Sequence, residues 1–169
     1  MGVSVLDPSP VSGPLLAVAA ASKGLHQAAL YLLDLPRPAF LDSSLTDGPG
    51  GRYSFLTADP FLDLRSRGRR VELIGPARRA VTEEDRWVLL QLVLRRYSVD
   101  RVAVLPPFLG GAVGYVGYDL GSTLERLPAT AADEGPPELD VGFYDWVLAA
   151  NHQSGEPSPS KGFWLDRAV

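Results

Sequence analysis

Polar side chains that could orient a small ligand flank one glycine-rich loop in the first third of the sequence. Asp42 and Ser43 follow a short apolar run, and Arg52 and Tyr53 come directly after Gly51, the last glycine of that loop. Small-molecule pockets use a few such polar groups within an apolar wall. Composition alone favours a plain hairpin at this place, and a ligand pocket is the alternative.

Glycines are also concentrated between positions 110 and 117, where a phosphate-binding loop is one interpretation. Gly110, Gly111, Gly114 and Gly117 lie inside an apolar strand pattern, whereas a phosphate-binding loop opens a helix after a strand. Glycine within a strand instead indicates that another backbone approaches closely. We therefore expect tight packing around this segment and no phosphate site.

Residues that could transfer protons or bind a metal are sparse. Asp119 and Asp145 lie in or beside aromatic-rich strands, where aspartate most often accepts hydrogen bonds from backbone amides or tyrosine hydroxyls. The two histidines, His26 and His152, are too few and too scattered for a typical zinc site or catalytic triad, and the sequence has no cysteine. We expect no catalytic residue, no metal ligands and no cofactor in this chain.

Composition bounds the class of protein and its partners. Hydrophobic residues make up 46% of the 169 residues and charged residues 21%, which is ordinary for a globular protein. A net charge of -4 offers no electrostatic footprint for nucleic acid. The apolar run Leu15–Ala21 is too short to span a bilayer and lacks the basic segment of a signal peptide. With no cysteine, we expect a cytoplasmic protein that binds neither nucleic acid nor membrane.

Arginines form the most basic cluster of the sequence, at positions 65, 67, 69, 70, 78 and 79. Alternation places the first three on one side of a strand or turn. We expect a solvated edge of a sheet here, and a patch for an anion or a partner is the alternative.

Apolar periodicity and turn residues predict an α+β fold with a layered helix/sheet body and mostly antiparallel strands. One helix follows Ser22 and stops at Pro36, and another covers residues 83–97 with Thr82 opening a variant of the capping box. Strands are expected at 39–41, 53–57, 61–66, 70–74, 108–118 and 139–150. Residues 1–14 are predicted to be a flexible arm and residues 154–169 a divergent, linker-like tail.

The helix predicted at 83–97 carries more apolar side chains than one narrow face needs. Trp87, Leu90, Leu94 and Tyr97 form one stripe, and neighbouring leucines and valines widen it. A helix of this kind must be covered by a sheet or by another domain.

Three motifs, taken in their order and spacing, are specific enough to indicate a family. They are Pro107–Gly121, Val141–Leu148 with Asn151–Gln153, and Leu41–Ser43 followed by Gly51–Leu56 and Ala58–Pro60. Within these motifs, the residues expected to have a structural role are Gly110, Gly111, Gly114, Tyr118, Asp119, Tyr144, Asp145 and Trp146. Together the motifs resemble the amino-terminal region of the anthranilate synthase and aminodeoxychorismate synthase component I family, so that one such domain is expected at residues 15–153.

The resemblance implies the amino-terminal part of a larger α/β/β/α chorismate-synthase-type fold. In that family, ammonia from a glutamine amidotransferase subunit replaces the 4-hydroxyl of chorismate, with the help of Mg²⁺. These ligands are held by a carboxy-terminal chorismate-binding domain that this sequence lacks, so the chain is expected to be non-catalytic and inactive alone. Gly117–Gly121 and Tyr144–Trp146 favour the aminodeoxychorismate branch, which leads to para-aminobenzoate and folate, and the anthranilate (tryptophan) branch is the alternative.

The resemblance also implies part of a tryptophan pocket. Ser43 lies where the family has a pocket serine, and Tyr53 lies on a pocket aromatic. Asp42 stands where anthranilate synthases usually have glutamate. Gly50 and Gly51 occupy positions where larger side chains can form pocket walls. A free-standing module that senses an aromatic amino acid or docks a partner is the remaining alternative.

Overall fold

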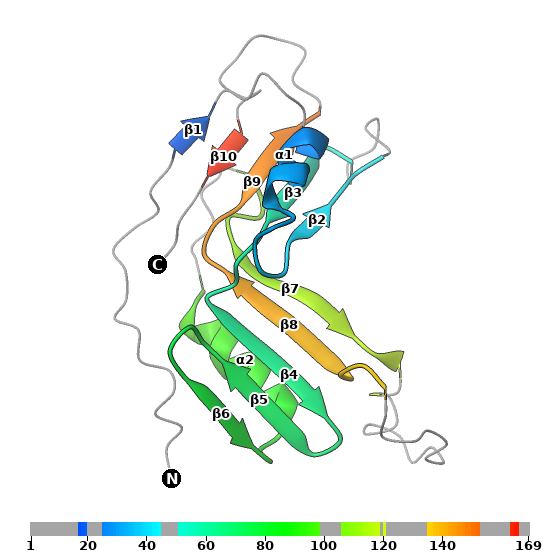
Figure 1. The fold of residues 1–169 in the computed structure, drawn as a ribbon, viewed down its shortest axis with the longest axis vertical. Coiled ribbons are helices and arrows are strands. Elements are labelled where there is room, and N and C mark those ends of the chain that lie inside the picture. The colour runs from blue at the N-terminus through cyan, green and yellow to red at the C-terminus, as the bar shows by residue number, and fades with distance from the viewer. Residues whose placement is uncertain are drawn as a thin grey trace. The chain divides into compact units, whose positions relative to one another are not determined.

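The computed structural model describes residues 17–19, 25–44, 51–98, 106–118, 120, 135–152 and 163–165. The predicted arm, Gly50, Asp119 and most of the predicted tail lie outside the described residues. The chain divides into two compact units, unit I (residues 1–8, 61–98 and 112–143) and unit II (residues 9–60, 99–111 and 144–169). Within the described residues, each unit is built on a five-stranded sheet (Figure 1).

Unit I is built on a sheet with the strand order β6-β5-β4-β8-β7. Its strands are β4 (Leu62–Arg67), β5 (Arg70–Ile74), β6 (Arg79–Thr82), β7 (Gly111–Val116) and β8 (Leu139–Tyr144). The pairs β4–β5, β4–β8 and β5–β6 are antiparallel, and β7 runs beside β8 in the opposite direction (Figure 1). Gly68 joins β4 to β5 with a φ of 53°, a conformation that glycine adopts readily and most residues do not.

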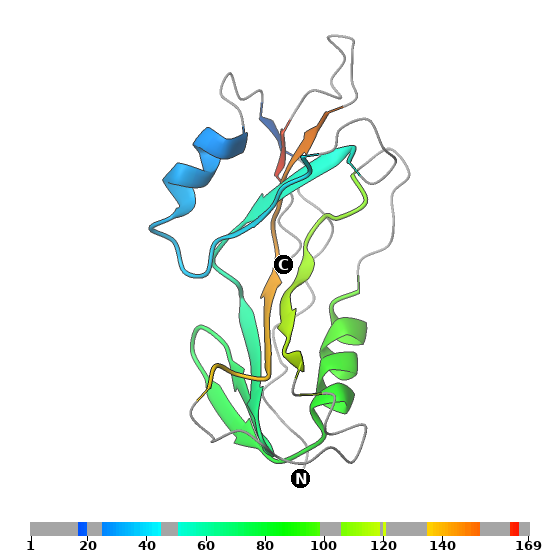
Figure 2. The same ribbon diagram turned by 90° about the vertical axis from the view of Figure 1, so that its right-hand side faces the viewer.

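Helix α2 (Arg86–Arg96) lies along the unit I sheet (Figure 2). Its buried side chains, Leu89 and Val93, join a core made with Leu62, Leu64, Val71, Leu73, Leu139, Val141 and Phe143. Leu90 and Tyr97 pack on the same core, whereas Leu94 is exposed. The predicted stripe is therefore right at Leu90 and Tyr97 and wrong at Leu94. The buried face is centred on the i, i+4 pair Leu89 and Val93, which turns Leu94 toward solvent.

The start of α2 also differs from the prediction. Thr82 ends β6, and its hydroxyl accepts a hydrogen bond from the Glu84 amide at 3.1 Å. The N-cap is Asp85, whose carboxylate accepts from the amides of Trp87 at 2.8 Å and Val88 at 3.0 Å. A carboxylate satisfies two orphan amides and complements the positive end of the helix dipole. Thr82 was therefore the wrong cap, and the preceding residues form a strand.

Unit II is built on a sheet with the order β1-β10-β9-β3-β2. Its strands are β1 (Ala17–Ala19), β2 (Ala39–Leu41), β3 (Tyr53–Thr57), β9 (Leu148–Asn151) and β10 (Phe163–Leu165), all paired antiparallel. Helix α1 (Leu25–Leu32) packs on this sheet through Leu25, which is buried with Leu56 of β3. Strand β10 lies within the segment that the sequence predicts to be a linker-like tail.

The strand predicted at 139–150 is two strands that belong to different sheets. β8 ends at Tyr144, β9 begins at Leu148, and Asp145–Val147 lies between them. The hydroxyl of Thr57 donates to the carbonyl of Trp146 at 2.7 Å, so a side chain, and not a neighbouring strand, satisfies this carbonyl. The predicted α+β class with mostly antiparallel strands is confirmed.

Two glycines of the motif sit where a side chain has no room, as predicted. A Cβ on Gly114 would collide with the carbonyl oxygen of Asp140 and lie 2.6 Å from the Cα of Val141, both in β8. Gly110 has a φ of 134°, and a Cβ there would lie 2.9 Å from the carbonyl oxygen of Tyr144. Glycine is required at both places because the opposing atoms are backbone and cannot rotate away.

Candidate functional site

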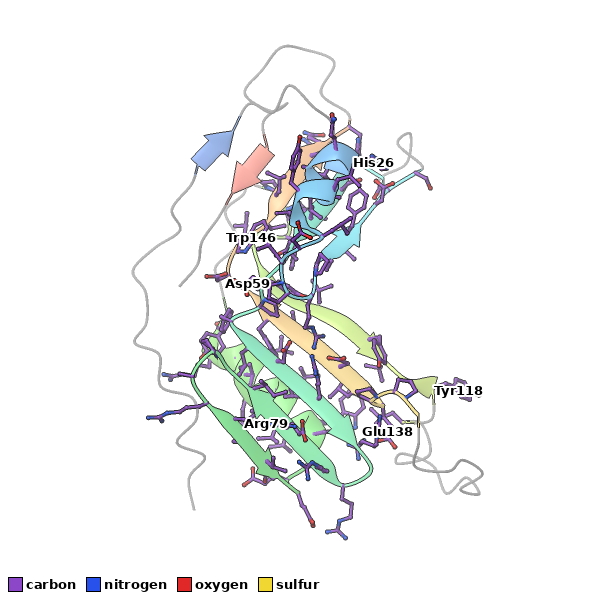
Figure 3. The ribbon with its side chains drawn as sticks, viewed as in Figure 1. His26, Asp59, Arg79, Tyr118, Glu138 and Trp146 are labelled. Atoms are coloured by element: carbon purple, nitrogen blue, oxygen red, sulfur yellow. The ribbon has the colours of Figure 1, made fainter. Side chains whose placement is uncertain are left out.

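The ends of three neighbouring strands of unit II bring together polar side chains that are distant in sequence. Asp42 and Ser43 follow β2, Ser54 lies in β3, and His152 follows β9. β3 pairs with β2 on one side and with β9 on the other. His26 joins them from α1, and Figure 3 shows it near β2. We call these five residues the polar cluster.

Ser54 is the centre of the polar cluster. Its side chain is fully buried, and its hydroxyl oxygen has three polar neighbours. The oxygen lies 3.0 Å from the backbone nitrogen of Ser43, 2.8 Å from Oδ1 of Asp42 and 2.7 Å from Nε2 of His152. A buried hydroxyl needs such partners because burial without them is unfavourable by about 1–3 kcal/mol.

The residues predicted to line a tryptophan pocket lie beside this cluster. The hydroxyl of Ser43 donates to the carbonyl of Tyr53 at 2.8 Å, so the structure brings these two residues together. Gly51 precedes Tyr53 by two positions and is buried, whereas Gly50 falls outside the described residues. The function of these residues stays a prediction.

Aromatic rings continue from the polar cluster along β3. The ring of Tyr53 stacks on Phe55 with centroids 5.9 Å apart, and Phe55 meets Phe108 edge-on at 5.6 Å. The guanidinium of Arg52 lies 5.1 Å from the centroid of the Tyr53 ring, a cation–π distance. An apolar wall beside a few fixed polar groups has the chemical character of a small-ligand site.

The carboxylate of Asp42 is held in its ionised form. The hydrogen bond from the Ser54 hydroxyl lowers the pKa of Asp42, and the nearby His26 and His152 and the Ser43 amide lower it further. Nε2 of His26 lies 3.4 Å from the second carboxylate oxygen, Oδ2, of Asp42. The arrangement therefore provides an anionic group at the solvent-accessible end of the cluster.

Asp42→Asn is expected to remove a pH-dependent part of the stability. Because the folded pKa of Asp42 is lower than the unfolded one, its stabilisation is present above about pH 4 and disappears as the pH falls through the folded pKa. Urea unfolding of both proteins across this range should show a difference at neutral pH that shrinks in acid. Asp34→Asn, in an exposed aspartate of the same unit, is the control. A wild-type advantage that is constant with pH contradicts the assignment.

Sequence reasoning gave no role to Ser54 and did not predict that both histidines lie beside the same polar residues. His152 contacts Ser54, and His26 contacts Asp42, so both belong to one cluster. The signal for Ser54 was a hydroxyl in a strand of apolar and aromatic neighbours, which must find partners when buried. The signal for His152 was weaker, because only the pairing of β3 with β9 brings it close.

The remaining motif residues have structural surroundings. The hydroxyl of Tyr144 donates to the carbonyl of Arg37 at 3.0 Å, and Arg37 has a positive φ of 47°. Gly111 also has a positive φ, 123°, so its requirement for glycine is conformational. Tyr118 is 95% exposed beyond the end of β7 (Figure 3). Asp145 is half-buried between β8 and β9, and its role as an acceptor stays a prediction.

The arginine cluster of unit I lies among carboxylates. Arg70 and Arg79 contact Glu72 at 2.8 and 2.6 Å, and Arg65 contacts Asp140 at 3.3 Å. The two arginines lower the pKa of Glu72. Surface pairs of this kind contribute about 0–1 kcal/mol each, and they agree with the predicted solvated edge more than with an anion patch.

In the described part of the chain, no group of three or more acidic or histidine side chains could hold a metal ion. None of the helices in that part is long and apolar enough to cross a membrane.

Sequence comparison relates the chain to two groups of enzymes. It is 36% identical over 129 residues to aminodeoxychorismate synthase component 1 of Escherichia coli, covering 72% of this chain and 27% of that protein. It is 36% identical over 125 residues to anthranilate synthase component 1 of Geobacillus stearothermophilus, covering 70% of this chain and 24% of that protein. The chain thus spans about a quarter of the length of these relatives. No family model matches.

A comparison of structures agrees on the fold. Anthranilate synthase component I of Streptococcus pneumoniae matches 65% of this chain and 24% of its own length, with a TM-score of 0.50 and 22% identity. Identity at this level supports a shared fold and nothing finer. Together with the sequence relatives, these matches show that the chain belongs to the family of aminodeoxychorismate synthase and anthranilate synthase component 1.

Proposed function

We propose that the chain is the amino-terminal, non-catalytic region of an aminodeoxychorismate synthase component 1, inactive without a carboxy-terminal chorismate-binding region. The observation that carries the proposal is the 36% identity to the E. coli enzyme, confined to 27% of that enzyme's length. The relatives' names describe the activities of whole proteins. In this proposal the chain contributes part of an enzyme body, and a region equivalent to the unmatched part of these relatives supplies chorismate binding, Mg²⁺ and contact with a glutamine amidotransferase subunit.

Exposed apolar side chains of unit I support a further covering region. Val88 and Leu92, one turn apart on α2, are 52% and 48% exposed, and Tyr115 and Val116 of β7 are 45% and 53% exposed. Large apolar side chains gathered on a surface are typical of interaction sites. In this proposal the carboxy-terminal region covers them.

The test is reconstitution. The purified chain is mixed with the carboxy-terminal region of the E. coli enzyme, and chorismate consumption is measured with ammonia and Mg²⁺. We expect no turnover by either part alone and turnover by the mixture. Turnover by the chain alone, in a preparation free of contaminating synthase, sinks the proposal.

Binding to carboxy-terminal regions of both kinds separates the two branches of the family. A second candidate, the anthranilate branch, is favoured by the 36% identity to the Geobacillus stearothermophilus enzyme. Three aminodeoxychorismate synthases match at 34 to 36% identity, which favours the folate branch. Because the carboxy-terminal region sets the chemistry, its anthranilate synthase counterpart is tested in parallel, and the partner that binds this chain more tightly identifies the branch.

We further propose that the polar cluster and the neighbouring rings of Tyr53, Phe55 and Phe108 are one part of a tryptophan pocket. Ser43 and Asp42 form its polar end, and Tyr53 forms its wall. Gly50 and Gly51 supply no side-chain wall, so the carboxy-terminal region must complete the pocket.

L-tryptophan is expected to leave the melting temperature of the isolated chain nearly unchanged and to raise it in the reconstituted mixture. A complete site at 100 times its Kd adds about 2.7 kcal/mol of stability. Ser43→Phe is expected to abolish the increase, and Ser44→Phe, at an exposed neighbour, to preserve it. A clear increase for the isolated chain would instead favour a free-standing sensing module.

A further inference from the structure

The hydroxyl of Ser54 has as many polar neighbours as it can bond. A serine hydroxyl has one proton to donate and two lone pairs to accept with. The Ser43 amide, at 3.0 Å, can only donate to it. The Asp42 carboxylate, at 2.8 Å, can only accept from it while ionised. One lone pair of Ser54 remains, and it faces Nε2 of His152 at 2.7 Å.

These constraints determine where the proton of His152 lies. If Ser54 gave its proton to His152, Oδ1 of Asp42 would face an oxygen 2.8 Å away with no proton between them. Two oxygens that both carry lone pairs repel at that distance. Nε2 of His152 must therefore be the donor, which leaves Nδ1 as the acceptor in the neutral ring.

The hydroxyl of Ser43, the second serine of the cluster, also donates its proton within the protein. The hydroxyl of Ser43 donates to the carbonyl of Tyr53 at 2.8 Å. Both hydroxyl protons of the cluster are therefore donated within the protein, one to Asp42 and one to Tyr53. The second carboxylate oxygen of Asp42, Oδ2, lies 3.4 Å from Nε2 of His26.

We propose that the protons of the polar cluster are ordered from Nε2 of His152 through Ser54 to Asp42. Ser54 and His152 are then positioning residues that hold the Asp42 carboxylate. The proton order depends only on the geometry of the cluster.

The proton order is tested by ¹⁵N NMR of the histidine side chains in the isolated chain at neutral pH. We expect His152 as the Nε2–H tautomer, and the Nδ1–H tautomer would overturn the proposal. Ser54→Ala should erase the tautomer preference of His152 and raise the titration midpoint of Asp42, and Ser54→Thr should restore both. The control is Ser66→Ala, at a buried serine of unit I, which should change neither signal.

Discussion

Gly114→Ala is expected to destabilise unit I by about 3 kcal/mol, the upper end of what overpacking usually produces. The added methyl group would collide with the carbonyl oxygen of Asp140 and the Cα of Val141. Those atoms belong to β8, which is held on its other side by β4, so the strands must separate to make room. Urea unfolding followed by circular dichroism measures the loss.

Gly75→Ala is the matched control for this substitution. Gly75 is in the same unit, and a Cβ there would lie 3.7 Å from its nearest neighbour, the carbonyl oxygen of Arg78, which is ordinary van der Waals contact. Both substitutions restrict the unfolded chain equally. Equal unfolding midpoints for the two variants would show that β7 does not lie against β8 as closely as described.

Val116→Lys is expected to weaken binding of the carboxy-terminal region at least tenfold, about 1.4 kcal/mol. β7 is an edge strand of unit I, and residues 111–118 carry no charge. Charged side chains on an exposed edge strand usually prevent it from pairing with a strand of another chain. We expect a strand or helix of the carboxy-terminal region to lie against β7, because the E. coli relative is more than three times longer than the part matched here.

The opposite edge of the same sheet provides the control. Val81 of β6 is 49% exposed, close to the 53% of Val116. Its strand already carries Arg79, paired with Glu72, so a lysine there adds charge to an edge that is already protected. We expect Val81→Lys to preserve binding of the carboxy-terminal region, measured by analytical ultracentrifugation of the mixture. Equal loss in both variants would exclude β7 as the specific contact, and a wild-type dimer broken by Val116→Lys would assign the edge to a second copy.

Local patterns predicted the elements that depend on local interactions. The β4–β5 hairpin follows from alternating side chains around Gly68, where a positive φ is needed. β3 follows from its aromatic and apolar content. α2 was found from its apolar spacing, although its first turn was misplaced because Glu83 and Glu84 suit a helix start as well as the link that the structure shows.

Features that depend on distant pairing could not be predicted. The run 139–150 is apolar apart from Asp140 and Asp145, so nothing local shows that it changes sheets after Tyr144. The same holds for the candidate site. Ser54 and His152 are 98 positions apart, and only the register of β3 with β9 brings them together. The resemblance located Ser43 and Tyr53, but it gave no hydrogen-bond partner for either residue.

The division into two units has a consequence for how the chain is synthesised and folds. The chain passes from unit II to unit I between Pro60 and Phe61, visits unit II again at residues 99–111, and makes its last return between Phe143 and Tyr144. β3 needs β9, which starts 95 residues after it, and β4 needs β8, which starts 77 residues after it. A nascent chain that ends before residue 139 therefore cannot complete either sheet. Chains with such non-local pairing fold slowly, so we expect the emerging polypeptide to depend on chaperones until β8 and β9 leave the ribosome.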